Sequence, residues 1–327
     1  MNLALREAWK YQGVTFANPA VGCTIVGNNG EILAVEAHKR AGEPHAEVEA
    51  LKTAYFKLTN DEKILELTTS AQIHTHLLEN HNGCFNGITV FTTLEPCSHI
   101  GKTPSCATLL SKLKIKKLFV GSLDSNEAAC GGNKIVEDAD IEVENCVLAK
   151  ECDALLNPFK LWQSKRFVFF KWAQRLNGTV DGGTISSNSS RTLVHAMRDV
   201  CDLLVIGGNT VRIDRPTLDA RLADGRAPDI LIVSKSTEFD KTIPLFNVND
   251  RKVIISDNFS ILENYKNIMI EGGQSMFELS KDFVDYYLCF LSAQIGGNMN
   301  FTGIEDKFDI LNIQKDEQDI IMWMRRG

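Results

Sequence analysis

Residues 45–51, HAEVEAL, and residues 93–106, TLEPCSHIGKTPSC, decide the fold of the first half of this chain. The first stretch opens a helix predicted from His45 to about Leu58, and the second lies between a β-rich run and another helix. The other predicted elements are strands at 21–26, 31–35, 87–94 and 118–122 and helices at 2–12 and 106–113. This alternation predicts an α/β sandwich with a largely buried sheet.

Three side chains in these stretches have the chemistry of zinc ligands. His45, Cys97 and Cys106 supply one imidazole and two thiolates, which fill three positions of a tetrahedral site and leave the fourth for water. Glu47 follows His45 by two residues, so its carboxylate can reach that water and carry its proton. A lone His or Cys is more often an ordinary buried side chain, and a structural zinc site takes a fourth protein ligand. The combination therefore predicts a catalytic Zn²⁺ site with Glu47 as the proton carrier.

The H-x-E and P-C patterns are typical of zinc deaminases, although the second cysteine usually follows the first more closely, as P-C-x-x-C. Here residues 98–105, SHIGKTPS, separate Cys97 from Cys106. With HAEVEAL and with NPAVGC at 18–23, this longer loop closely resembles the bifunctional deaminase/reductase family of riboflavin biosynthesis. The resemblance covers nearly the whole chain. It implies a cytidine-deaminase-like α/β/α sandwich that hydrolytically deaminates 2,5-diamino-6-(5-phosphoribosylamino)pyrimidin-4-one, with substrate contacts from Asn18, His38, His99 and Lys102.

The pattern changes around residues 147–165, where a helix-like stretch reaches Asn157-Pro158 and a new strand begins at Phe167. We therefore expect a deaminase domain at 1–148 and a second domain at 149–327. The second half again alternates, with strands predicted at 167–173, 203–206, 229–233, 252–256, 267–270 and 286–293 and helices at 189–199 and 274–282.

The second half also resembles the family, in its C-terminal reductase domain. The resemblance implies a dihydrofolate-reductase-like α/β fold that uses NADPH to convert the ribosyl group to a ribityl side chain. It assigns cofactor contacts to Ala173, Thr210, Asp214, Ser234, Gly272 and Gly273, and substrate contacts to Arg198, Leu218, Arg221 and Glu271. By their chemistry alone, the two glycines are more often a tight turn and the arginines solvated charges.

Two departures from the family pattern leave alternatives open. Leu176-Asn177-Gly178 stands where the family commonly has Leu-Asp-Gly, and Gly182-Gly183-Thr184-Ile185 where it has Ser-x-Trp-Ile. A deaminase with a degenerate reductase domain is therefore one alternative. A tRNA or nucleoside base deaminase and a zinc-stabilised binding module are two others.

The composition of the chain limits the classes of binding partner that we expect. Lys and Arg number 35 against 42 Asp and Glu, which gives a formal charge of −7 and argues against nucleic-acid binding. No run approaches the roughly 20 apolar residues of a membrane span, and the N-terminus lacks the features of a signal peptide. We therefore expect nine reduced cysteines, a cytoplasmic location and a phosphorylated pyrimidine as substrate; the resemblance adds a homo-oligomer.

One polar stretch, 59–86, shows no clear period and is interpreted as a surface segment. Its His74, His76, His81 and Cys84 lack a compact ligand pattern, so no second metal site is predicted there.

Overall fold

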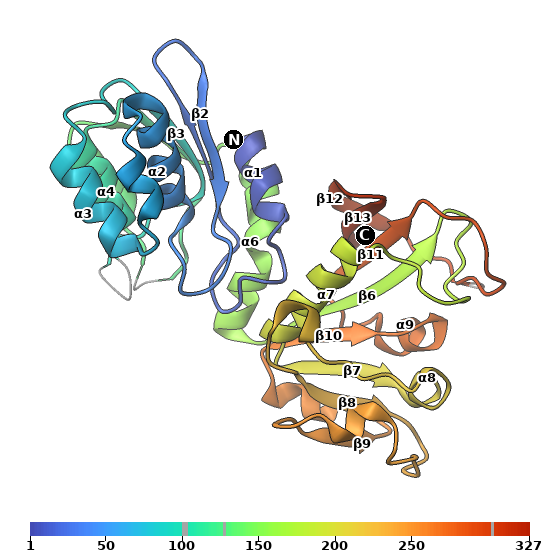
Figure 1. The fold of residues 1–327 in the computed structure, drawn as a ribbon. Helices are drawn as coiled ribbons and strands as arrows, with labels where there is room; N and C mark the ends of the chain where they lie inside the picture. The colour runs from blue at the N-terminus through green and yellow to red at the C-terminus, as the bar shows by residue number, and fades with distance from the viewer. Residues whose placement is uncertain (100–103, 127–128, 302–303) are drawn as a thin grey trace. The chain divides into compact units, whose positions relative to one another are not determined.

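The computed structural model describes residues 1–99, 104–126, 129–301 and 304–327, and the chain divides into two compact units, Met1–Lys160 and Leu161–Gly327 (Figure 1). Helix α6 (Ala149–Ser164) spans this division. The boundary predicted after residue 148 precedes α6, whereas the structural division falls inside it, because the helix continues through Pro158.

The first unit is built on a five-stranded sheet in the order β2-β1-β3-β4-β5. Strand β1 pairs antiparallel with β2 and β3, while β3, β4 and β5 are parallel. The strands are β1 (Gly22–Val26), β2 (Ile32–Ala37), β3 (Thr89–Leu94), β4 (Lys117–Ser122) and β5 (Glu142–Glu144). The other helices are α1 (Asn2–Trp9), α2 (Ala46–Thr59), the 3₁₀ helix η1 (Glu62–Glu66), α3 (Ser70–Asn80), α4 (Cys106–Leu113) and α5 (Gly132–Glu137).

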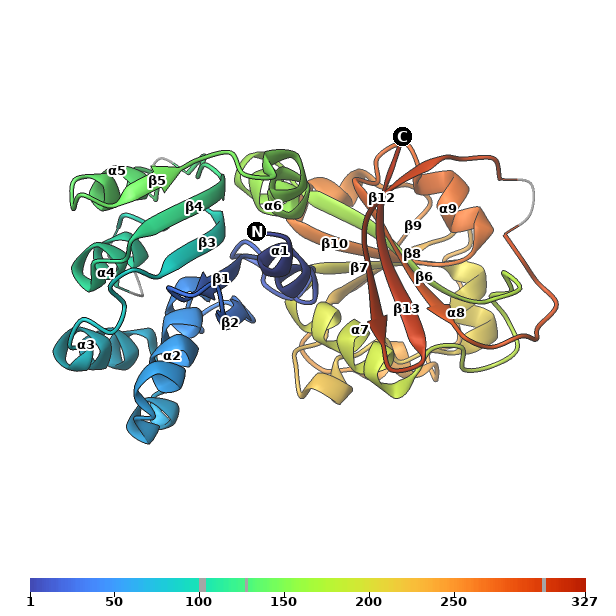
Figure 2. The same ribbon diagram turned by 90° about the horizontal axis from the view of Figure 1, so that it is seen from above.

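Helices cover both faces of this sheet. Figure 2 shows α2, α3, α4 and α5 along one face and α1 and α6 along the other. The core between the sheet and the first group contains Ile25 and Val90 from the strands and Leu51 and Leu110 from the helices, all fully buried. The predicted α/β/α sandwich is confirmed.

Residues 59–86, interpreted as a surface segment, contain a helix that was not predicted. Helix α3 forms there, begins with a capping box between Thr69 and Gln72, and buries Ile73 and Leu77. These two residues and the partly buried Leu78 are the aliphatic side chains that pack against the core, so the apolar period is too short to stand out among polar neighbours. Helix α5 and strand β5 were also not predicted.

The second unit contains an eight-stranded sheet in the order β12-β13-β11-β6-β10-β7-β8-β9. The strands are β6 (Phe167–Arg175), β7 (Leu203–Gly207), β8 (Asp229–Val233), β9 (Val253–Ser256), β10 (Asn267–Glu271), β11 (Tyr286–Ser292), β12 (Phe308–Asp316) and β13 (Asp319–Arg326). The helices are α7 (Asn188–Val200), α8 (Gly208–Asp214) and α9 (Gln274–Ser280), with the 3₁₀ helices η2 (Arg221–Ala223), η3 (Pro244–Asn247) and η4 (Ser260–Asn264).

Six strands of this sheet are parallel, and β12 and β13 add an antiparallel hairpin at one edge. The parallel strands were predicted because they are continuous apolar runs, as buried strands in parallel sheets are. The hairpin was not predicted, since β12 is an edge strand with no fully buried residue and a mixed polar and apolar sequence.

Two glycine turns meet at the carboxyl edge of the parallel strands. Strand β7 runs into α8 at Gly207, and β10 runs into α9 through Gly272. A Cβ atom on Gly207 would lie 3.2 Å from the Met276 side chain, and one on Gly272 would lie 2.6 Å from it. Met276 therefore packs between the two turns and requires a glycine in at least the second.

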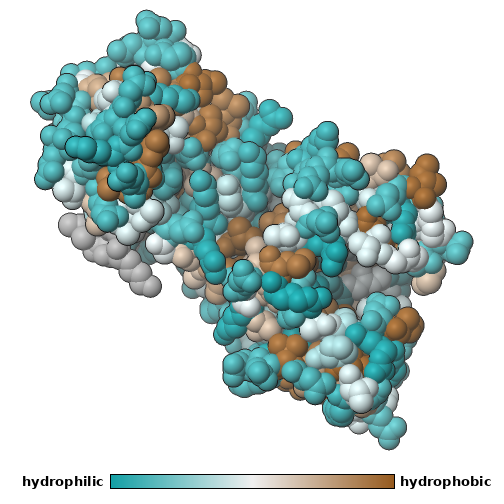
Figure 3. Space-filling view, in the orientation of Figure 1, coloured by the Kyte–Doolittle hydropathy of each residue, from teal (hydrophilic) through white to brown (hydrophobic). Residues whose placement is uncertain are grey.

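On the face shown in Figure 3, hydrophilic residues cover most of both units and the apolar patches are small. Within the described residues, no helix has the length and apolar character needed to cross a membrane.

Candidate active sites

Three side chains of the first unit converge as a ligand set. The Cys97 and Cys106 Sγ atoms lie 3.7 and 3.4 Å from Nδ1 of His45. All three ligand atoms lie within 4.8 Å of one another. In the described part of the chain, no other three His, Cys, Asp or Glu side chains form such a group.

The ends of secondary-structure elements place these ligands. His45 is the N-cap of α2, Cys97 follows β3 by three residues, and Cys106 is the first residue of α4. Ser105 joins the last two, because its hydroxyl accepts from Thr108 N at the start of α4 and donates to the carbonyl of Cys97.

The donor set fits zinc. Tetrahedral coordination with ordinary Zn–N and Zn–S bonds places the nitrogen and sulfur ligands about 3.6 Å apart, close to both distances seen here. Hydrogen bonding from Cys106 lowers the pKa of the Cys97 thiol to about 4, so this sulfur is a thiolate at neutral pH.

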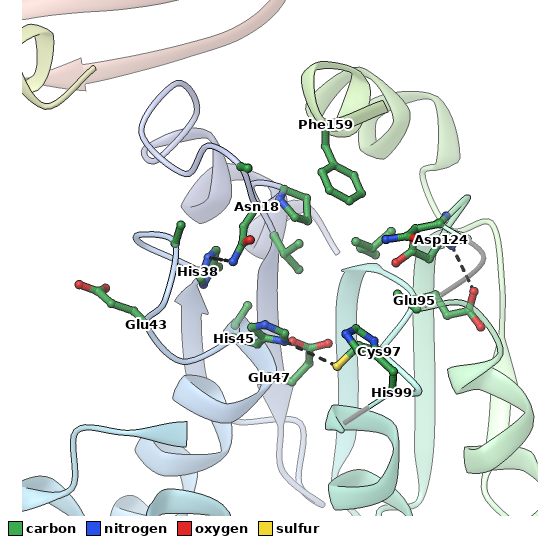
Figure 4. Close-up of a pocket in the computed structure, with 18 of the residues that line it drawn as sticks. Asn18, His38, Glu43, His45, Glu47, Glu95, Cys97, His99, Asp124 and Phe159 are labelled. Carbon is green, nitrogen blue, oxygen red and sulfur yellow. Dashed lines mark hydrogen bonds between the residues drawn. The ribbon is translucent and has the colours of Figure 1, made fainter. Parts of the chain in front are cut away.

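Glu47 lies in the first turn of α2 with only 4% of its surface exposed. Burial raises its pKa to about 7, against the opposing effect of His45. Its carboxyl group faces the cavity beside Cys97 (Figure 4).

This cavity has a volume of about 600 Å³ and holds most of the residues predicted for the first site. His45, Glu47 and Cys97 line it together with Asn18, His38 and His99. Cys106 is buried and does not line the cavity, and Lys102 lies outside the described residues.

The lining residues that the sequence did not predict include Glu95, Asp124, Asn126 and Phe159. Figure 4 shows Phe159 reaching in from α6 and Asp124 on the wall opposite His38. Asp124 and Asn126 follow the carboxyl end of β4, where ligands bind in parallel sheets, and that position was the available signal.

The histidines of segment 59–86 form no further ligand group among the described residues. His76 pairs with Asp61 at 2.9 Å, and the His81 ring accepts from Gly83 N. His74 is buried on α3, and burial lowers its pKa to about 4.

The residues predicted to contact a cofactor lie along the second sheet, most of them at the carboxyl edge of the parallel strands. Ala173 is in β6, Thr210 and Asp214 are in α8, and Ser234 follows β8. Gly272 and Gly273 form the turn before α9, and a Cβ on Gly273 would meet no atom within 4 Å. Two glycine turns and open space beside the backbone fit a dinucleotide at this edge.

The residues predicted to hold the second substrate belong to one charged network. Arg198 donates from Nε and Nη2 to Glu271 Oε1, at 3.1 and 2.8 Å, and from Nη1 to the carbonyl of Asp219. Arg221 pairs with the Asp219 carboxylate at 2.7 Å and is more than half exposed. Leu218 is buried, and its carbonyl accepts from Arg251.

Lys171 was missed as part of this network. Its Nζ atom lies 3.7 Å from Glu271 Oε2, and both side chains are largely buried. The signal was a lysine that directly follows the apolar run Phe167–Phe170 within β6.

The two departures from the family pattern lie in a loop with well-defined contacts. The Asn177 amide donates to Gly296 O at 3.0 Å, a bond that aspartate cannot make. Buried Arg175 donates to the carbonyls of Asp181 and Gly182.

Both units of the chain are similar to known proteins. The model of the cytidine and deoxycytidylate deaminase zinc-binding region matches residues 1–122, and the RibD C-terminal domain matches residues 166–322. The riboflavin biosynthesis protein RibD of Actinobacillus pleuropneumoniae is 32% identical, over 93% of this chain and 79% of that protein. RibD of Aquifex aeolicus is 29% identical, over 100% of this chain and 97% of that protein.

A solved structure from Thermotoga maritima, a diaminohydroxyphosphoribosylaminopyrimidine deaminase/5-amino-6-(5-phosphoribosylamino)uracil reductase, is 28% identical. It aligns over 100% of this chain and 97% of its own with a TM-score of 0.66. RibD of Acinetobacter baumannii shares the fold, with 22% identity and a TM-score of 0.61 over 100% and 97% of the two chains. The chain therefore belongs to the RibD family of riboflavin biosynthesis proteins, with a zinc-binding deaminase region in its first unit and a RibD C-terminal domain in its second.

Proposed function

We propose that this chain catalyses two consecutive steps of riboflavin biosynthesis. The first unit hydrolyses an amino group from 2,5-diamino-6-(5-phosphoribosylamino)pyrimidin-4-one, and the second reduces the ribosyl group of the product to ribityl with NADPH. The observation that carries the proposal is the close approach of His45, Cys97 and Cys106 beside a cavity that His45, Cys97 and Glu47 line, in a chain that also carries the RibD C-terminal domain. A degenerate reductase or a nucleic-acid deaminase is not favoured.

His45, Cys97 and Cys106 would hold zinc, which makes a bound water acidic enough to act as the nucleophile. Hydrolysis would form a bond from the water oxygen to the ring carbon and break the bond from that carbon to the amino nitrogen. Glu47 takes the proton of the water and returns it to the departing nitrogen, so ammonia leaves. Its place beside Cys97 in a buried setting supports this role.

The remaining cavity residues bind and orient the pyrimidine. Asn18 and His38 lie on one side and His99 close to Cys97, so hydrogen-bonding groups surround the space beside the ligands (Figure 4). Lys102 completes the proposed substrate contacts.

In the second unit, Ala173, Thr210, Asp214, Ser234, Gly272 and Gly273 would hold NADPH, which supplies the hydride for the sugar C1′ when bound. Arg221 is exposed enough to meet the substrate phosphate. Arg198 donates through three nitrogens to protein oxygens, so it chiefly fixes Glu271, and Leu218 contributes an apolar contact.

The proposal is tested by incubating purified chain with the diaminopyrimidine phosphate, with and without NADPH. We expect ammonia in both cases, and oxidation of NADPH in the case that contains it. If no ammonia is released, the deaminase assignment is wrong. Ammonia release with no NADPH oxidation leaves a deaminase with a degenerate reductase.

The same proposal includes a homo-oligomer in the cytoplasm that acts on a free nucleotide-like substrate. Light scattering of the purified chain measures its oligomeric state. Salt-sensitive binding of tRNA would favour the base-deaminase alternative instead.

A further inference from the structure

Glu95 is a buried carboxylate that accepts three backbone hydrogen bonds. Its Oε2 accepts from Asp124 N at 3.1 Å, and its Oε1 accepts from Gly131 N at 3.0 Å and Asn133 N at 3.1 Å. Only 7% of the residue is exposed. All three donors lie in the segment that follows β4, whereas Glu95 follows β3, so one side chain joins two neighbouring strand ends.

The residues next to Glu95 join the same two segments. Ser98 donates from its backbone N and its hydroxyl to the carbonyl of Ala129, at 3.0 and 3.1 Å, and from its hydroxyl to Cys130 O at 2.6 Å. Gly132 lies so close to the Pro96 carbonyl that a Cβ atom there would overlap it. Residues 95–98, which include Cys97, are therefore held against the residues after β4 by several hydrogen bonds and one close backbone contact.

Those residues form one wall of the deaminase cavity. Asp124, Asn126 and Ala129, here called the β4 wall, line the same space as His45, Glu47 and Cys97. The Asp124 carboxylate accepts from Asn126 N at 2.8 Å, which shapes the wall itself. The place of the wall relative to Cys97 depends on Glu95 and Ser98, because their contacts join the two segments. Figure 4 shows the bond between Glu95 and Asp124.

We propose that Glu95 is a positioning residue for the deaminase substrate: its carboxylate holds the β4 wall at the distance from Cys97 that the pyrimidine ring needs. This inference rests on the proposed function of the first unit. Glu95 acts through the backbone of the wall rather than on the reacting atoms.

The chemistry explains why a carboxylate is needed here. Three N–H groups converge, so the side chain must offer acceptors only, and an ionised carboxylate has two oxygens with about four acceptor sites. Glutamine keeps one oxygen for Gly131 and Asn133, but it turns an NH₂ group toward the Asp124 N–H. The substitution therefore loosens the wall at the residue that lines the cavity.

The test compares E95Q with the full-length wild type. We expect KM for the pyrimidine to rise about tenfold or more with a smaller change in kcat, and zinc content and the KM for NADPH to stay unchanged. Hydrogen exchange at the Asp124 amide should become faster. The second unit serves as an internal control because its reductase activity does not use the β4 wall.

D61N is the matched control. Asp61 accepts a backbone hydrogen bond from Lys63 N and pairs with His76 in the same unit, away from the cavity. The D61N variant should have a lower melting temperature and an unchanged KM for the pyrimidine. If E95Q fails to fold, S98A tests the same wall, because it removes the hydroxyl bonds to Ala129 and Cys130 while the backbone bond to Ala129 and the Glu95 contacts remain.

An unchanged KM in E95Q, or in S98A if that variant replaces it, overturns the proposal. So does a loss of activity that only follows loss of zinc, since Glu95 would then support the metal ligand alone. If the wild type releases no ammonia, the proposed function fails instead. The positioning role is then judged by hydrogen exchange, and an Asp124 amide that exchanges as in the wild type contradicts it.

Discussion

Asn18 and His38 share a hydrogen bond of 3.1 Å between the side-chain amide Nδ2 and the imidazole Nε2, and Nδ1 of the same ring lies 3.0 Å from the carbonyl of Pro44. Because a carbonyl only accepts, Nδ1 carries the proton and Nε2 accepts from Asn18. Burial lowers the pKa of His38 to about 4, so this neutral form persists at physiological pH. The ring also meets the edge of His45, with centroids 5.6 Å apart. Asn18 and His38 thus form one side of the cavity next to a proposed zinc ligand.

The first prediction concerns this pair. N18D replaces the amide donor by a carboxylate that cannot donate to the neutral His38 ring, so the side of the cavity should loosen. We expect KM for the pyrimidine to rise about tenfold, a loss of about 1.4 kcal/mol of binding, in steady-state deaminase assays. N28D makes the same change at an exposed amide that bonds Asn86 O, and it should leave KM unchanged. Equal KM values for N18D and wild type would count against the assigned role.

A second prediction tests the ligand set. C106S replaces a thiolate by a weak zinc ligand, so metal affinity should fall at least tenfold and ammonia release should fall with it. Elemental analysis of the purified variant measures the zinc content. C146S alters an exposed cysteine and should retain zinc. Reductase activity should persist in both variants, and full zinc occupancy in C106S would show that the ligand set is misassigned.

The third prediction separates proton transfer from metal binding. E47Q keeps the shape of the side chain but cannot carry a proton, so the deaminase kcat should fall by about 10²–10⁴. Zinc content should remain that of the wild type. E49Q changes a carboxylate in the same first turn of α2 that does not line the cavity, and its kcat should stay within about twofold of the wild type. Substantial turnover by E47Q would assign the proton to another group.

The fourth prediction concerns stability against pH in the second unit. Burial alone would raise the pKa of Glu271, but the charges of Arg198 and Lys171 lower it to about 2. A carboxyl whose pKa is depressed in the folded state stabilises the fold above its unfolded pKa of about 4.3. That contribution is lost as pH falls from there toward 2.

E271Q leaves both cations buried without their partner, so we expect the free energy of unfolding to fall by about 3–5 kcal/mol at pH 7. The difference from wild type should narrow between about pH 4.3 and 2. Urea unfolding followed by tryptophan fluorescence measures it. D309N removes an exposed partner of Arg325 and should cost less than about 1 kcal/mol. A gap that does not change with pH would mean that Glu271 is not ionised in the fold.

The sequence alone determined which residues carry the chemistry of the first site and where most strands of both sheets lie in the chain. His45, Glu47, Cys97 and Cys106 stand in short local motifs at the ends of strands and helices, so their meeting follows from a small number of turns. The parallel strands of the second unit are apolar runs, and burial on both faces demands such runs. Both the motifs and the apolar runs consist of residues close together in the chain, and for that reason the sequence alone predicts them.

Only the tertiary structure decided the β4 wall, the edge hairpin and the network around Glu271. Glu95 reaches Gly131 36 residues away, and Arg198 reaches Glu271 73 residues away. Each of these side chains is by itself an ordinary charged residue, and no local pattern marks its partner. The partners become apparent only when the packed sheets bring distant strand ends together, because burial makes an unpaired charge costly and so requires each charge to have its partner there.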